Sequence, residues 1–159
     1  MKRNLAIEVI SGLLILLFVY TAVSKLLDFT TFQVQLSKSP FINAYANTVA
    51  WTLPAGEILV ALALTFKRTH LLGLYASLFL MTMFTAYIWT MLHYSYYIPC
   101  SCGGILSKMG WNQHLWFNVG FVLLSIIGII LQKKQNLVYS KKPEKKTEEL
   151  PPVVYTAMS

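Results

Sequence analysis

The sequence contains little charge, because only 12% of its 159 residues are Asp, Glu, Lys or Arg. Soluble domains carry roughly 25% charged residues, whereas 56% of this chain is hydrophobic and its mean hydropathy is +0.57. So few charges cannot cover a surface that faces water. The composition therefore excludes a soluble enzyme, a disordered protein and a small disulfide-stapled secreted domain, and it indicates a single domain that faces lipid.

Sustained alternation of polar and apolar residues is also absent, so β-strands are not expected. The chain instead contains four apolar stretches close to the length of about 20 residues that a membrane-spanning helix needs. They cover approximately residues 5–27, 44–66, 71–92 and 114–131. The sequence therefore predicts an all-α polytopic membrane protein: a bundle of four transmembrane helices in residues 1–132, followed by a basic, disordered tail in residues 133–159.

Lysine and arginine are distributed unevenly between the two ends of the predicted helices. Ten of the thirteen precede the first stretch, separate the second from the third, or follow the fourth, and only Lys25, Lys38 and Lys108 lie on the other side. Because positive charge marks cytoplasmic loops, both termini are predicted to lie in the cytoplasm, and the loops around residues 28–43 and 93–113 outside. The net charge of +7 is then explained by these flanks, with the lipid bilayer and not nucleic acid as the partner.

The first outer loop has an apolar pattern of its own. Phe29, Phe32 and Leu36 fall on one face of a helix, while the residues between them are mainly polar. A short helix lying in the membrane interface and an ordinary polar loop are both compatible with this pattern.

Cysteine is scarce, since Cys100 and Cys102 are the only two in the chain. They lie in the predicted outer loop, where disulfides persist if the loop faces a bacterial periplasm. A disulfide between them closes a very small ring, which favours a strained and easily reduced bond. Pro99 fixes the backbone before the pair, and Gly103 and Gly104 supply the freedom for a tight turn. These features favour thiol–disulfide exchange over an inert or structural pair and over a metal site.

Histidines lie at both ends of the cysteine loop. His93 and His114, together with the two cysteines, would make a tetrahedral zinc set, but the spacing matches no standard zinc pattern and no metal site is predicted. His114 has a second role to consider, because a hydrogen-bond donor or a positive charge beside a thiol stabilises its thiolate. Lys25 and Lys108 are further candidates for that role.

One acidic residue, Glu57, falls deep inside a predicted span, about 18 Å along the second helix and near the membrane midplane. An intramembrane carboxylate is energetically costly and is therefore a candidate functional group, here for proton movement or transport. The alternative is a protonated Glu57 that bonds to a Thr or Tyr on a facing helix. Asn118, one helical turn from His114, is expected to hold helices together.

Several segments occur together in a pattern found in one family. They are Ser24-Lys25-Leu26, Pro54-Ala55-Gly56-Glu57, the loop Pro99-Cys100-Ser101-Cys102-Gly103-Gly104, and Trp111 followed by His114 and Asn118. Over about residues 5–131 the chain resembles the MauE branch of the DoxX-like four-helix membrane proteins of bacteria. The resemblance implies an inner-membrane bundle that helps mature a disulfide-rich periplasmic protein in methylamine utilisation, beside a thioredoxin-like partner. It also implies a redox pair, Cys100 and Cys102, with His114 and Glu57 as further site candidates.

A chain with one cysteine pair cannot relay electrons between two internal pairs. It must exchange directly with a partner thiol protein or pass electrons to a quinone, and the sequence identifies no quinone site. The expected function is an inner-membrane thiol–disulfide exchange factor that acts on periplasmic proteins through Cys100 and Cys102. Two alternatives stay open: a non-catalytic membrane scaffold or assembly subunit with structural cysteines, and a small transporter that uses Glu57.

Overall fold

Residues 5–39, 41–94 and 110–140 are described by a computed structural model, and within these ranges every regular element is a helix. The elements are α1 (Leu5–Leu27), α2 (Phe29–Ser37), the short 3-10 helix η1 (Asn43–Tyr45), α3 (Ala46–Thr65), α4 (His70–Tyr94) and α5 (Trp111–Ser140). Four segments are long and apolar enough to cross a membrane: Leu5–Leu27, Asn43–Thr65, His70–Tyr94 and Asn112–Val138. The predicted all-α, four-span architecture is therefore confirmed.

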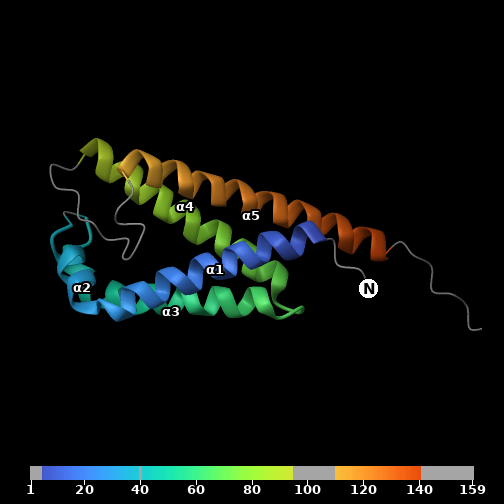
Figure 1. The fold of residues 1–159 in the computed structure, drawn as a ribbon, viewed down its shortest axis with the longest axis horizontal. Coiled ribbons are helices and arrows are strands. Elements are labelled where there is room, and N and C mark those ends of the chain that lie inside the picture. Colours follow the sequence, from blue (N-terminus) through green and yellow to red (C-terminus); the bar gives the residue numbers. More distant parts are fainter. Residues whose placement is uncertain (1–4, 40, 95–109, 141–159) are drawn as a thin grey trace, which may run out of the picture.

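The four long helices close into a bundle. Helix α1 packs against α3 and α5, and α4 packs against the same two helices. The short helix α2 lies at one end of this bundle (Figure 1), where α1 and α4 end and α5 begins. We call this the α2 end. The opposite end holds the start of α1, the connection between α3 and α4, and the end of α5.

The bundle has the inside and the outside expected of a protein in lipid. Its main core cluster contains Leu14 and Phe18 of α1, Leu64 of α3 and Leu74 of α4. Many large apolar side chains are exposed on its surface, among them Leu16, Leu59, Phe79 and Trp116. An exposed apolar surface of this extent is compatible with contact to the acyl chains of a bilayer.

Helix α2 resolves the two interpretations of the first outer loop. Phe32 and Leu36 are each 4% exposed and pack against Ala46 and Ala50 of α3. The segment is therefore a helix held by an apolar face, and the polar-loop interpretation is wrong.

Helix α5 is longer than the sequence predicted. The fourth span was expected to end near residue 131, but the helix continues to Ser140. Residues 132–138 contain no Gly or Pro and several good helix formers, so nothing in the sequence ends the helix there. The ammonium of Lys133 lies 5.4 Å from the ring centroid of Tyr75 and connects this extension to α4. Residues 141–159 of the predicted tail lie outside the described residues.

Candidate functional site

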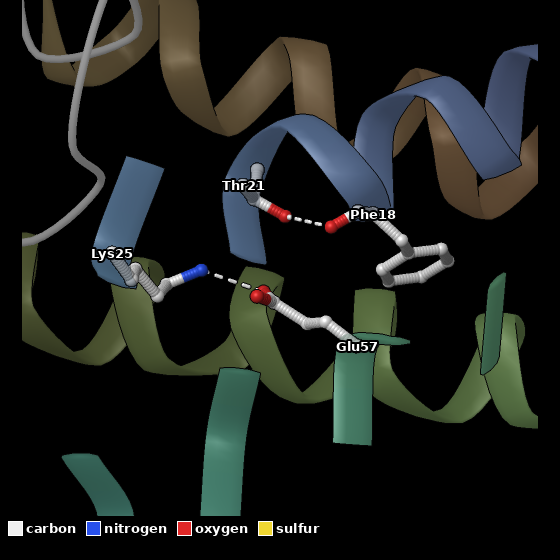
Figure 2. Close-up of polar contacts among 4 residues, drawn as sticks. All are labelled: Phe18, Thr21, Lys25 and Glu57. Carbon is white, nitrogen blue, oxygen red and sulfur yellow. Dashed lines mark hydrogen bonds and ion pairs between the residues drawn. The ribbon is translucent and has the colours of Figure 1, made fainter. Parts of the chain in front are cut away.

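A buried ion pair connects α1 with α3. Lys25 lies in the last turn of α1, and its Nζ atom is 2.6 Å from Oε1 of Glu57. Lys25 is 7% exposed and Glu57 is fully buried. Figure 2 shows the two side chains extending toward each other from their helices. Because an isolated charge is strongly disfavoured in a low-dielectric interior, each of these charges makes the burial of the other tolerable.

Glu57 has a partner that the sequence did not suggest, because Lys25 of α1 donates to its Oε1 atom. The sequence-based alternative named a Thr or Tyr on a facing helix, and Thr21 of α1 does interact with the Glu57 carboxyl group. The nearby hydroxyl of Thr21 donates to the backbone carbonyl of Phe18 at 3.2 Å (Figure 2). The second carboxylate oxygen of Glu57, Oε2, is buried and has no hydrogen-bond partner within the described part of the chain.

Aromatic rings complete the surroundings of the ammonium group. The Nζ atom of Lys25 lies 5.9 Å from the ring centroid of Phe32 in α2 and 5.6 Å from that of Phe84 in α4. Both distances permit cation–π attraction. The Lys25 charge is thus held by groups from three different helices, α2, α3 and α4.

The ion pair lies on the wall of a cavity of about 420 Å³ at the α2 end. Most of the wall is apolar, with residues from all four long helices and from α2. Four residues that the sequence marked independently line this one cavity: Lys25, Glu57, His114 and Asn118. The structure therefore brings candidates from three separate spans into a single site.

Helix α5 contributes two of these four residues. His114 and Asn118 are each 5% exposed, and as residues four apart they lie on one face of the helix. Lys25 is close enough to His114 for its charge to act on the imidazole. His114 and Asn118 are therefore the polar residues that α5 contributes to the cavity wall.

Sequence reasoning missed three polar residues of the cavity wall, Thr21, Tyr45 and Tyr87. The Tyr87 hydroxyl donates to Oγ of Ser39 at 3.0 Å and connects α4 with the chain that follows α2. The available signal was the one-turn spacing of Tyr87 from Phe84 and Met91, which puts its polar tip on the same face of α4 as these two apolar cavity residues.

The remaining candidates are placed differently. Pro99, Cys100, Cys102, Gly103, Gly104 and Lys108 lie outside the described residues. Trp111 begins α5. His93 is exposed, its Nδ1 atom lies 2.9 Å from the carbonyl oxygen of Trp89, and it is not among the residues that line the cavity.

A second buried polar contact, also missed by sequence reasoning, lies at the opposite end of the bundle. His70 opens α4 and is 2% exposed, and its Nε2 atom is 2.7 Å from Oγ of Ser11 in α1. The Ser11 hydroxyl donates its one hydrogen to the carbonyl of Ile7 at 2.8 Å. His70 Nε2 must then be the donor to Ser11, which defines the tautomer of the ring.

Comparison with known proteins identifies one family. Residues 3–131 match the family described as methylamine utilisation protein MauE. The match includes α1 to α4 and the part of α5 that lines the cavity, and it confirms the MauE resemblance; the wider DoxX-like grouping stays a prediction. No curated protein matches the chain, and no solved structure does.

Proposed function

Since the chain belongs to the MauE family, we propose that it is a membrane protein of methylamine utilisation that exchanges disulfides with proteins outside the cytoplasmic membrane. The observation that carries this proposal is the position of the only two cysteines. In sequence they lie between Tyr94, where α4 ends, and Trp111, where α5 begins, and both of these helix ends are at the α2 end. Cys100 follows Tyr94 by six residues, so it cannot lie farther than about 20 Å from the end of α4.

The exchange has two steps, each of which replaces one S–S bond by another. A thiolate of a periplasmic protein attacks one sulfur of the Cys100–Cys102 disulfide, which forms a mixed disulfide and releases the other loop sulfur as a thiolate. A second thiolate of the same protein then attacks the mixed disulfide, so that protein leaves as a disulfide and the loop is left as a dithiol. A thioredoxin-like protein that carries a disulfide restores the loop by the same two steps in the opposite direction.

Lys25, Glu57 and His114 have different roles in this proposal. Lys25 is already paired with Glu57, so its charge is matched before any thiolate forms. His114, which opens the α5 side of the cavity, is then the residue that favours a loop thiolate, as a hydrogen-bond donor. Glu57 keeps Lys25 in place and takes no part in the sulfur chemistry.

Charge at the opposite end supports the proposed orientation in an inner membrane. Lys67 and Arg68 connect α3 with α4 there, and Lys133 and Lys134 lie on the extension of α5. Positive residues favour the cytoplasmic side, so the cysteine loop faces the periplasm.

Trapping of the mixed disulfide tests the proposal. In cells that express Cys100→Ser or Cys102→Ser, we expect one of the two variants to accumulate a reducible adduct with a periplasmic protein on a non-reducing gel. The double variant Cys100→Ser/Cys102→Ser is the matched control and forms none. A membrane-impermeant maleimide, added to intact spheroplasts after reduction, is expected to label the wild-type loop.

Two outcomes count against disulfide exchange. Maleimide labelling only after the membrane is broken places the cysteines in the cytoplasm and contradicts the orientation. Full biological activity of the double variant shows that the chain is a scaffold whose cysteines are not needed for its function.

A further inference from the structure

The cavity at the α2 end is partly open to the surroundings of the bundle and is much larger than a packing defect. Interiors are packed as densely as organic crystals, and few voids exceed one water molecule. A volume of about 420 Å³ falls instead within the range of about 300–1,000 Å³ that is typical of small-molecule sites. Space of this size beside a buried ion pair indicates an occupant.

Glu57 indicates what that occupant donates. Glu57 lines the cavity, and its Oε2 atom is buried without a hydrogen-bond partner in the described ranges. A buried acceptor that stays unpaired is destabilising, and more so when it is charged. The Thr21 hydroxyl acts on the Glu57 carboxyl group but donates its one hydrogen to the Phe18 carbonyl, so Oε2 has no hydrogen-bond partner within residues 5–39, 41–94 and 110–140. A hydroxyl group on a ligand would supply one.

The charge of the site indicates that the ligand is neutral. Lys25 and Glu57 cancel each other, so a phosphate, carboxylate or ammonium head would add an unbalanced charge to a low-dielectric cavity. The rings of Phe32, Phe84 and Phe117 on the wall suit a flat ring, which stacks on them or meets them edge to face. The apolar remainder of the wall suits a hydrocarbon substituent.

We infer that this cavity binds a lipid-soluble molecule whose head is an uncharged, hydroxyl-bearing aromatic ring, the class of phenols and hydroquinones. The ring hydroxyl donates to Glu57 Oε2, while Asn118 lies on the wall as a further polar group. The residues that carry this inference are all described ones, and neither cysteine is among them. Ligand binding and disulfide exchange are therefore separate properties that can be tested separately.

Three probes of similar size separate the parts of this inference. Purified full-length protein in lipid nanodiscs is titrated without oxygen with a decyl-substituted hydroquinone, its dimethyl ether and a long-chain alcohol, and binding is measured by equilibrium dialysis. We expect the hydroquinone to bind at least about tenfold more tightly than the ether, since the ether leaves Glu57 Oε2 unpaired. The alcohol has a hydroxyl but no ring and is expected to bind more weakly than the hydroquinone.

A pair of variants in one helix locates the site. Leu53→Phe adds a ring at the cavity wall, whereas Leu59→Phe makes the same change at a side chain that is 65% exposed on the outside of α3. We expect Leu53→Phe to weaken hydroquinone binding by about tenfold or more and Leu59→Phe to leave it unchanged. Melting of both variants near the wild-type temperature shows that they are folded.

The inference is overturned if the three probes bind equally, because the cavity then accepts any lipid chain. It is also overturned if Leu53→Phe melts like the wild type and binds the hydroquinone equally well, because the ligand then lies elsewhere. The variant Cys100→Ser/Cys102→Ser keeps its hydroquinone affinity under this inference. A failure of disulfide exchange therefore leaves the result for the cavity intact, and the reverse also holds.

Discussion

Two buried polar contacts in the described part of the chain join α1 to its neighbours in different ways. At the α2 end, Lys25 and Glu57 form an ion pair, line a cavity and leave one carboxylate oxygen without a hydrogen-bond partner in the described chain. At the opposite end, the contact between Ser11 and His70 is a hydrogen bond. A hydrogen bond between helices is sufficient to hold them together, so the costlier ion pair and the space beside it call for a functional explanation.

The two ends of the bundle also differ in how closely their helices pack. Near His70, a Cβ atom on Gly73 would lie 2.8 Å from the backbone nitrogen of Leu64, so α4 approaches α3 as closely as a glycine permits. Gly128 of α5 is similarly close to Leu74, since a Cβ atom on this glycine would lie 3.1 Å from Leu74 Cδ2. The opposite end is thus tightly packed, whereas the α2 end keeps room for a ligand.

Breaking the ion pair is expected to have the largest effect on stability. Lys25→Met or Glu57→Gln alone leaves the other charge buried without its counterion and should cost about 3–5 kcal/mol. Removing both charges in Lys25→Met/Glu57→Gln should recover most of this loss. Reversible unfolding of the four proteins in mixed micelles measures the coupling, and simple additivity of the two single effects would contradict a direct interaction.

Gly73→Ala is expected to have the next largest effect. The added methyl group meets the backbone of α3, which cannot move as a side chain can, and overpacking of this kind costs about 1–3 kcal/mol. Gly12→Ala is the matched control, because a Cβ there has no neighbour within 4 Å. The control should unfold at the same denaturant concentration as the wild type or a higher one; equal destabilisation by both changes would argue against close packing at Gly73.

The smallest effect is expected from Ser11→Ala. It removes the hydrogen bond to His70, and interhelical hydrogen bonds in membranes contribute about 0.6 kcal/mol on average. The same unfolding titration detects this loss, and hydroquinone binding at the α2 end should be unchanged. A loss as large as that of Lys25→Met would show that the two polar contacts are equivalent, and the contrast between the two ends of the bundle would disappear.

Hydropathy alone predicted the fold. The first span matches α1 residue for residue, and the other three differ at their ends, where length and hydropathy give no stop signal. The largest difference is at the end of α5, because polar residues such as Gln132 and Lys133 are as compatible with a helix outside the membrane as with a tail. The apolar face of Phe29, Phe32 and Leu36 was sufficient to suggest α2, though not to exclude a loop.

The sequence predicted individual residues of the candidate site but not which of them contact one another. Glu57 could be chosen without a structure because a buried carboxylate is costly. Asn118 could be chosen because it lies one helical turn from His114 in a predicted span. Sequence does not give the rotation of one helix against the next, so the pairing of Lys25 with Glu57 was missed and Lys25 was assigned to the cysteines. Ser11 and His70 were missed for the same reason, since each is ordinary in its own segment.

The length of α5 affects how the bundle is oriented in a bilayer. Its 30 residues give a length of about 45 Å, whereas the hydrocarbon layer is about 30 Å thick. The helix must therefore tilt, or its extra turns must project into the headgroup region, and Lys133 and Lys134 lie in those extra turns. Two ammonium groups there resist any vertical sliding, so changes in bilayer thickness are met by a change in tilt.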